Sequence, residues 1–400
     1  MNWLLKYKEK YDESAYNSFK TGPKNNHSLS NLKFIFFIFS FLIQIRIILS
    51  SNEIIIKLTA TESQQQILGS RFNSQPSSIS STETTITNDS TDFRIIHLNP
   101  SNGIYSIKLD FTEKIESLQG MFTNRTNLLE IDLSSFDSSL VSTMTDMFYG
   151  CTSLTSINIG NINTSLVEKM TLMFYNCYSL VELDLSSFDT SKVTNMSFLF
   201  FNCTGLAVLK IDNFNTSNVQ DMNTMFYNLY SLEKLEINFD TSKIVDMCYM
   251  FSDCYKLTSI NLTMFDTSLV TNMQYMFRGC ESITSLDISN FDTSNVKYMD
   301  YLFSDCYGLK FLNVSFLNTS NVINMEYMFS ECSALTSIDL SNFRTDKVEK
   351  MNQMFKGCEK LSSLDLSSFN TNSITNLQGM FAYCFSLTSL NLSNFYTPQL

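Results

Sequence analysis

The residues best suited to bind a metal or form disulfides are cysteines that recur at one spacing. Nine of the ten cysteines follow a phenylalanine by three residues, and with Phe226 included these phenylalanines lie 26 residues apart except for one interval of 25. The nine are Cys151, Cys177, Cys203, Cys254, Cys280, Cys306, Cys332, Cys358 and Cys384. Leu229 takes the position in one repeat, and Cys248 lies out of register.

The leucine replacement favours a buried structural role for these cysteines, since a free cysteine packs as a small hydrophobic residue. Disulfides remain an alternative in a secreted chain, although nine aligned cysteines cannot pair completely. Zinc needs clustered cysteine and histidine, whereas His27 and His97 both precede the repeats. The sequence therefore predicts a core ladder of cysteines, no metal site and no cofactor.

Methionine and aspartate recur as well. Eighteen of the twenty methionines occupy two positions in register with the phenylalanine, which indicates core packing rather than a copper site.

Two aspartate columns, one including Asp184 and the other Asp189, offer oxygens to calcium. The glycine-rich loops of calcium-binding solenoids are absent, with eleven glycines in the chain. Solvation and turn capping are therefore the simpler interpretations.

The polar residues also argue against two classes of function. An enzyme needs one unique constellation of groups, but this chain repeats each polar feature many times and carries no nucleophile elbow or phosphate loop. We therefore expect no enzymatic activity. The net charge of −12 would repel a phosphate backbone, so nucleic acid is not an expected partner.

The repeat itself predicts the elements that carry these residues. In "LVELDLSSFDTSKVTNMSFLFFNC", residues 180–203, Leu183 and Leu185 alternate with polar residues as in a short strand. Val193, Met196 and Phe200 recur at steps of three and four, the spacing of one face of a helical turn. Between them, "FDTS" has the composition of a turn and a helix cap.

Such a unit cannot bury its apolar face alone, but stacked units can. The sequence therefore predicts an α/β solenoid over residues 104–400, a right-handed leucine-rich-repeat solenoid of about eleven 26-residue coils with a parallel sheet on one face. The irregular first unit, "IYSIKLDFTEKIESLQGMF", is expected to form its N-terminal cap. No C-terminal cap is recognisable before Leu400.

Three further zones precede the solenoid. Residues 1–33 form a polar, lysine-rich segment, and residues 34–50 contain the hydrophobic run "FIFFIFSFLIQIRIIL". That run fits a signal anchor that holds the chain in a membrane, a cleaved signal peptide, or a buried segment. The first two interpretations place the repeats outside the cell. Residues 51–103, rich in serine, threonine and asparagine, are expected to form a flexible linker.

The recurring string L-x-x-L-D-L-S-x-F-D-T-S-x-V-x-N-M-x-x-M-F-x-x-C resembles the BspA-like leucine-rich-repeat surface proteins. It runs from Leu128 through Leu400 and is clearest in "SLDISNFDTSNVKYMDYLFSDC". The resemblance implies a secreted or membrane-anchored solenoid at the cell surface that mediates adhesion or protein recognition. Its implied partner is a matrix or cell-surface protein. The alternative is a membrane-tethered or intracellular scaffold, or the binding part of a truncated receptor.

A solenoid of this kind would bind through outward strand residues, most of which are Ser, Thr, Asn or Asp here. Two adjacent repeats depart from that composition at Val208, Lys210, Lys234 and Glu236, and Phe311 adds an aromatic residue further along. We expect these five residues to form the ligand-contact surface. Neutral drift in one pair of repeats would explain the departure equally well.

Overall fold

The computed structural model describes residues 52–99, 103–160 and 162–396. All of them belong to one structural unit, Asn52–Leu400. The lysine-rich segment and the hydrophobic run predicted over 1–33 and 34–50 lie outside the described residues. Within the described ranges, no helix has the length and apolar character needed to span a membrane.

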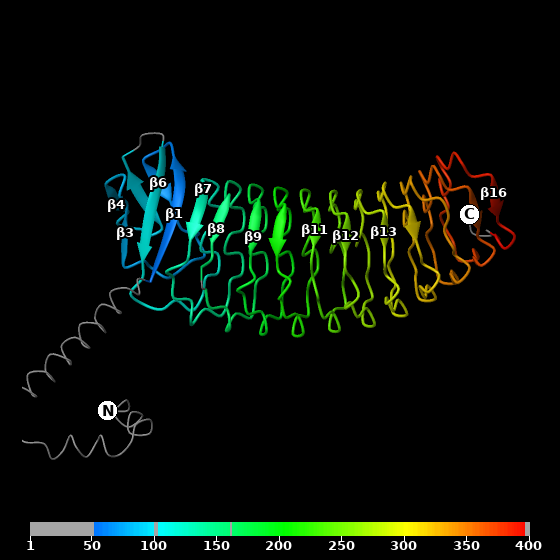
Figure 1. Ribbon diagram of the computed structural model, residues 1–400, viewed down its shortest axis with the longest axis horizontal. Helices are drawn as coiled ribbons and strands as arrows, with labels where there is room; N and C mark the ends of the chain where they lie inside the picture. The colour runs from blue at the N-terminus through cyan, green and yellow to red at the C-terminus, as the bar shows by residue number, and fades with distance from the viewer. Residues whose placement is uncertain (1–51, 100–102, 161, 397–400) are drawn as a thin grey trace, which may run out of the picture. The chain divides into compact units, whose positions relative to one another are not determined.

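The unit begins with a mixed sheet, built on β1 (Glu53–Ala60). The alternation in β1 buries Ile54, Ile56 and Leu58 on one face. β1 pairs antiparallel with β6 (Gly103–Asp110) and with β7 (Leu128–Asp132). β3 (Ser78–Ser80) and β8 (Ser156–Asn158) complete the order β3-β6-β1-β7-β8. This sheet closes the N-terminal edge of the repeats (Figure 1).

The structure therefore differs from the flexible linker expected over 51–103. Besides β1 and β3, this region contains the antiparallel sheet β2-β5-β4, formed by β2 (Gln64–Gln66), β5 (Ile95–Leu98) and β4 (Ile86–Asn88). The polar composition of the region conceals β1 and β5, whose Ile54, Ile56, Ile96 and Leu98 are buried in the core. Residues 104–110 are also not part of a parallel coil, because β6 runs antiparallel to β1.

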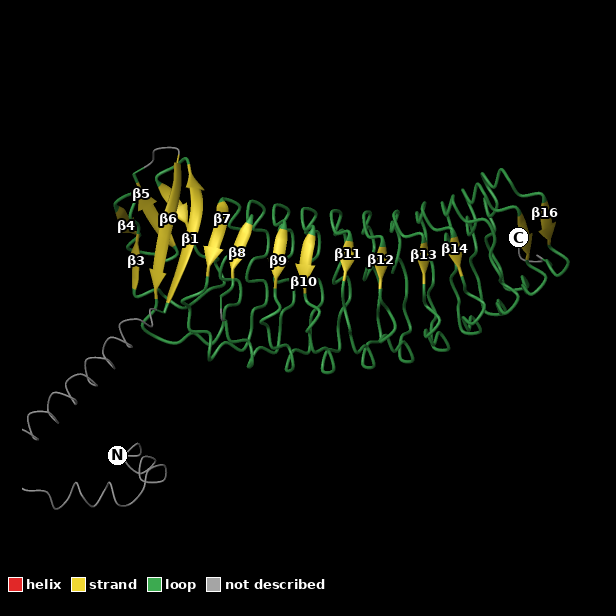
Figure 2. Ribbon diagram, in the orientation of Figure 1, coloured by secondary structure: helices red, strands yellow, loops and turns green. Residues whose placement is uncertain are grey.

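From β7 onward, 26-residue coils follow one another along a β-solenoid, as the repeat predicted (Figures 1 and 2). The short strands lie on the same face of successive coils, and the coil around Ile338 has none. The later strands are β9 (Glu182–Asp184), β10 (Val208–Lys210), β11 (Lys234–Leu235), β12 (Ser259–Ile260), β13 (Ser285–Leu286), β14 (Phe311–Leu312), β15 (Ser363–Asp365) and β16 (Ser389–Asn391). Every pair of these strands that is hydrogen-bonded is parallel.

The helical turn expected after each strand is absent from the described residues, where the coils contain successive turns instead (Figure 2). The backbone amides alternate between two kinds of partner. Phe174 N–H donates to Leu199 of the next coil at 3.0 Å, whereas Tyr175 N–H donates to Leu172 three residues back at 3.2 Å. In the preceding turn, the amide of Met173 donates to Met170. Leu172 is the third residue of that turn and has a φ of 60°, as expected for a type II turn. Steps of three and four therefore reflect turns here, and the α part of the α/β prediction was wrong.

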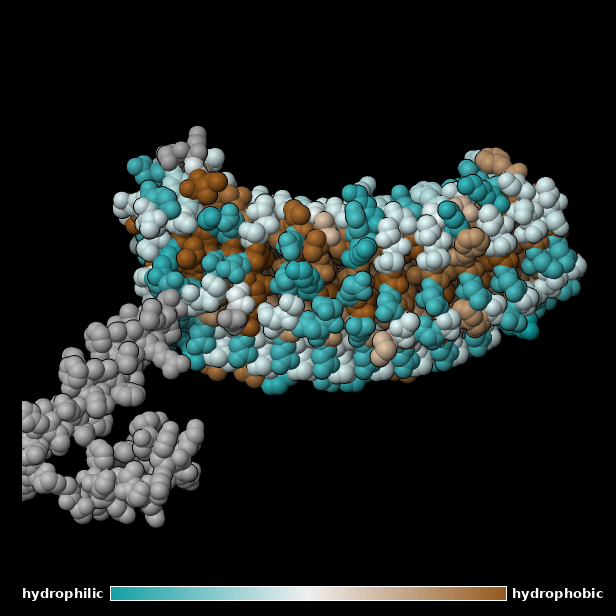
Figure 3. Space-filling model, viewed as in Figure 1, coloured by the Kyte–Doolittle hydropathy of each residue, from teal (hydrophilic) through white to brown (hydrophobic). Residues whose placement is uncertain are grey.

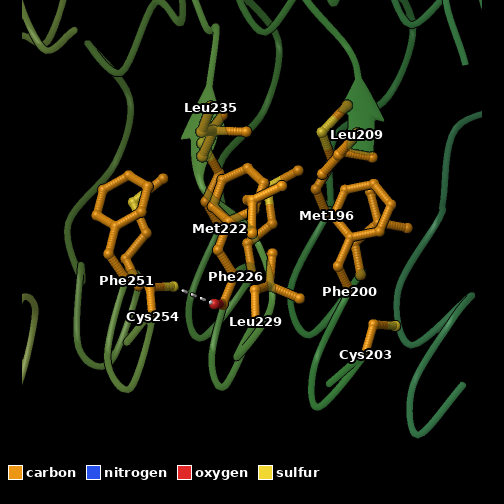
Figure 4. Packing of buried hydrophobic residues seen from close by; sticks show 14 of the residues in the cluster. Met196, Phe200, Cys203, Leu209, Met222, Phe226, Leu229, Leu235, Phe251 and Cys254 are labelled. Carbon is orange, nitrogen blue, oxygen red and sulfur yellow. Dashed lines mark hydrogen bonds between the residues drawn. The ribbon is translucent and has the colours of Figure 1, made fainter. Parts of the chain in front are cut away.

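The core lies between the strands and these turns and runs the length of the solenoid. Phe200, Phe226 and Phe251 stack with ring centroids 5.9 and 5.4 Å apart, and their side chains are fully buried (Figure 4). Methionine and leucine side chains fill the space around each ring (Figure 4). Each coil thus buries its apolar residues against its neighbours, which is how a solenoid is stabilised.

Candidate functional site

The strand face combines a hydrophobic stripe with polar borders. Figure 3 shows this stripe along the unit, with hydrophilic side chains on either side of it. Ile157 and Ile260 on the strands are partly exposed there, whereas Leu183 and Leu209 are buried beneath the face. Serine on the neighbouring strand positions is too small to cover Ile157 and Ile260. The strand face is therefore a shallow surface rather than a deep cleft.

Within this face, β9 and β10 bring two exposed valines together. Val181 is 55% exposed and Val208 is 43% exposed, and the Val208 amide donates to the Val181 carbonyl at 3.2 Å. Lys210 lies at the other end of β10, with Nζ 2.9 Å from Asp184 Oδ2 and 3.6 Å from Glu182 Oε1. We call Val181, Glu182, Asp184, Val208 and Lys210 the β9–β10 surface.

Both partners of the main ion pair on this surface are charged at neutral pH. Hydrogen bonds from Ser186 and Lys210 lower the pKa of Asp184 to about 2. The bond to Asp184 raises the pKa of Lys210 above its usual value. Because the pair is open to solvent, it contributes little to stability, but it sets an ordered pattern of charge beside the two valines.

The five residues predicted as a contact surface are only partly brought together. Val208 and Lys210 share β10, but Lys210 is directed toward β9 rather than toward Lys234. Lys234 belongs to β11, which pairs with β12 in a separate two-stranded sheet. Glu236, with Ile260, borders a shallow hollow of about 310 Å³ across β11–β13.

Phe311, the fifth predicted residue, lies well along the solenoid. It is 66% exposed on β14 and pairs with Ser285 of β13. It does not belong to the β9–β10 surface. In contrast, Val181 was missed, although an apolar residue where most repeats carry threonine or serine was a visible signal in the sequence.

A second hollow lies where the N-terminal sheet meets the first coils, and the sequence did not indicate it. It measures about 630 Å³ and spans β1, β6, β7 and β8. Its apolar lining comes from Ile55, Ile131 and Ile157. Lys57 and Glu130 also line it, and Lys57 Nζ lies 2.6 Å from Glu130 Oε2. No sequence signal could reveal this hollow while residues 51–103 were regarded as a linker.

The nine cysteines of the ladder are free thiols that line up through the core. Eight are buried, and Cys384 in the last coil is partly exposed. Each thiol donates to the carbonyl of the phenylalanine in the preceding coil, as Cys254 does to Phe226 at 3.2 Å (Figure 4). Burial raises the pKa of Cys254 and Cys306 to about 12. These groups are protonated at neutral pH and poor nucleophiles.

The aspartate columns form turns rather than metal sites. Asp132 Oδ1 accepts hydrogen bonds from Ser134 N at 2.8 Å and from Asn158 Nδ2 at 3.1 Å. Asp189 Oδ1 likewise accepts from Ser191 N at 3.0 Å. In the part of the chain that the structure describes, no three acidic, cysteine or histidine side chains are arranged to hold a metal ion.

A ladder of tyrosines on the turn side was also missed. Tyr249, Tyr275, Tyr301 and Tyr327 stack with centroids 4.4, 4.5 and 4.4 Å apart. All four have positive φ, between 55° and 58°. The recurrence of tyrosine five residues before four successive cysteines, Cys254 to Cys332, was visible in the sequence, but the helix assumed there obscured its meaning.

Comparison with solved structures finds repeat proteins. A leucine rich cell surface protein from Faecalibacterium prausnitzii is 17% identical, with a TM-score of 0.30 over 64% of this chain and 84% of that one. TLR13 in its complex with ssRNA13 is 17% identical, with a TM-score of 0.28; the match covers 66% of this chain and 36% of TLR13. The functional domain of InlJ from Listeria monocytogenes, which includes a cysteine ladder, is 16% identical, with a TM-score of 0.22 over 67% and 64%.

No curated protein matches the chain. One family model matches it four times, over residues 102–208, 194–312, 234–337 and 308–400. The matches overlap and together extend over the whole solenoid. The chain therefore belongs to the family described as "Mycoplasma protein of unknown function, DUF285".

Proposed function

We propose that this solenoid is a recognition module that binds a protein partner through the β9–β10 surface and catalyses no reaction. The observation that carries the proposal is the pair of exposed valines beside an ordered charge pattern, on a strand face otherwise composed mainly of small polar residues. Val181 and Val208 supply apolar contact, and Glu182, Asp184 and Lys210 lie beside them along β9 and β10. Apolar groups bordered by polar and charged groups are the usual composition of a protein interface.

The proposal includes display at the cell surface and a role in adhesion, with a matrix or cell-surface protein as partner. The repeat string that resembles BspA-like proteins supports this part, and so does the hydrophobic run over 34–50, as a signal peptide or anchor. A right-handed sense of winding, as in the leucine-rich repeats that the string resembles, belongs to the same proposal.

Protease accessibility on intact cells tests the location. An epitope tag inserted after Ser81, at an exposed turn between β3 and β4, should be digested without permeabilisation. Protection of the tag until the membrane is opened would contradict surface display and would favour an intracellular scaffold.

Binding of the purified chain to immobilised fibronectin, fibrinogen and collagen tests the partner class. If one of them binds, the double variant Val181→Ser/Val208→Ser should lose at least about tenfold in affinity, because hot spots lie at the apolar centre of an interface. The matched control is Leu269→Ser, a 50% exposed residue in the turn Thr267–Val270, which should bind normally. Equal binding by the double variant would exclude the β9–β10 surface.

A further inference from the structure

A second row of parallel bridges runs along the turn side of the solenoid. It links Ser117 to Thr143 and continues through single residues of successive coils to Asn376. Two backbone hydrogen bonds support each step. At one step, for example, Thr194 N–H donates to Glu168 and Met170 N–H donates to Asn195.

Within the described coils, this row is interrupted at one step only. The bridges run up to Asp221 and resume at Asp246, with none between these two residues. The two amides that would support the missing step are those of Met222 and Val245. Neither makes the inter-coil backbone bond that its counterparts Met196 and Thr271 make, at 2.9 Å each.

The interrupted step is also the only one in the row that places like charges opposite each other. Every other step pairs two neutral residues or a charged residue with a neutral one. Each of the two carboxylates is occupied on its outer side: Asn195 donates to Asp221 at 3.2 Å and Asn272 to Asp246 at 3.3 Å. Like charges directly opposite in neighbouring strands are destabilising, which accounts for the open step.

The coils remain joined elsewhere at this point. Phe226 N–H donates to Met250 at 3.0 Å, and the Phe226 and Phe251 rings stack in the core. The amide of Thr224, two residues after Met222, also donates to Cys248 of the next coil at 3.2 Å. The opening is therefore confined to one step of the row, between coils that stay joined on either side of it.

We propose that Asp221 and Asp246 form a charge-sensitive hinge between two stacks of coils. Repulsion between the carboxylates holds this one step of the row open, and neutralising either one closes it. The hinge runs between β10 and β11, which belong to different sheets. Its state therefore sets the spacing between Lys210 and Lys234 across the strand face.

Hydrogen exchange at the amides of Met222 and Val245 in the full chain tests the hinge. Both should exchange faster than those of Met196 and Thr271. Asp246→Asn should slow both by about tenfold, the factor expected for one restored hydrogen bond, and Asp221→Asn should do the same. In the wild type, about 1 M NaCl should slow them as well, because salt screens the repulsion.

Asp287→Asn is the matched control, since it removes the same charge from the strand face and should leave both amides unchanged. The boundary coil is also one residue shorter than the others, which is the competing cause of the open step. If both Asn variants exchange like the wild type, the shorter coil holds the step open and the charge hinge is excluded. Slow exchange at Met222 and Val245 in the wild type would exclude an open step altogether.

Discussion

At the residue scale, the threonine of the "FDTS" turn is a buried link between coils. Thr293 is 1% exposed; its hydroxyl donates to the Asn318 carbonyl at 3.0 Å and accepts from the Asn318 amide at 2.8 Å. The same position is buried in successive coils, at Thr164, Thr190, Thr216, Thr241, Thr267, Thr319, Thr345 and Thr371. A small hydroxyl therefore satisfies backbone groups that the solenoid interior would otherwise leave unpaired.

Replacing Thr293 by valine, which has nearly the same shape, should destabilise the solenoid by about 1–3 kcal/mol. The reason is that the amide and the carbonyl of Asn318 would both lose the hydroxyl that they bond to at this partly buried position. Urea unfolding followed by circular dichroism measures the difference. Thr284→Val, at an exposed strand position, serves as the control and should change stability by less than about 0.5 kcal/mol. Equal effects would mean that the buried hydroxyl has no special role.

The cysteine ladder leads to a prediction about reactivity. Because burial raises the pKa of Cys151, Cys254 and Cys306 to about 12, the buried native thiols, all except Cys384, should not react with a disulfide reagent at pH 8. All ten should react after unfolding in guanidinium chloride. A Val208→Cys variant, with its thiol on the exposed strand face, should add one rapidly reacting group. Rapid reaction of several ladder thiols in the native chain would contradict their burial.

At the element scale, the turn segments carry strain that stacking offsets. A bulky residue with positive φ is conformationally unfavourable by about 1–2 kcal/mol, yet Tyr275 and Tyr301 both have a φ of 58°. Their rings stack with centroids 4.5 Å apart and an angle of 10° between the ring planes. Contacts between neighbouring coils thus stabilise a local conformation that neither coil would favour alone.

A double-mutant cycle on Tyr275 and Tyr301 should measure this contribution. The alanine variants should show a coupling of about 0.5–1.5 kcal/mol in the free energy of unfolding. Tyr275→Phe and Tyr301→Phe keep the rings and should retain most of the coupling. Additive effects of the two alanine substitutions would show that the stacked arrangement does not stabilise the solenoid.

At the scale of the whole molecule, repeated turn aspartates make stability depend on pH. Backbone and side-chain hydrogen bonds from Ser242 lower the pKa of Asp240, and those from Ser294 lower the pKa of Asp292. The folded pKa then lies below the unfolded value, so the stabilisation is complete above about pH 4. It is lost as the pH falls further and the folded carboxylates become protonated.

The urea midpoint should therefore decrease between pH 6 and about pH 2.5. The double variant Asp240→Asn/Asp292→Asn should keep the wild-type midpoint at pH 6 and lose less of it in acid. Asparagine suits the comparison because Asn215 and Asn318 make the same turn bonds to Ser217 and Ser320 at 3.1 Å. An identical acid response of variant and wild type would show that these turns are not responsible.

Recurrence in the sequence was enough to predict the stacked coils. Phe226 and its equivalents are apolar in every coil and can be buried only if the coils stack, so a solenoid with one strand per coil followed directly. Two residues of the β9–β10 surface could be predicted from the sequence, because Val208 and Lys210 depart visibly from the repeat. That Lys210 is paired with Asp184 of the preceding coil depends on side-chain geometry, and the repeat contains no information about it.

The sequence by itself determined the repeat length, the strand face and the columns of buried residues, because burial imposes the same residue type on every coil. Only the tertiary structure decided that the turn segments are not helical, since amides such as that of Phe174 bond to the next coil rather than within their own. It also decided that β1 and β6 close the first coil. Pairing between segments as distant as Ile55 and Asp132 depends on long-range packing, which a local pattern of polar and apolar residues does not encode.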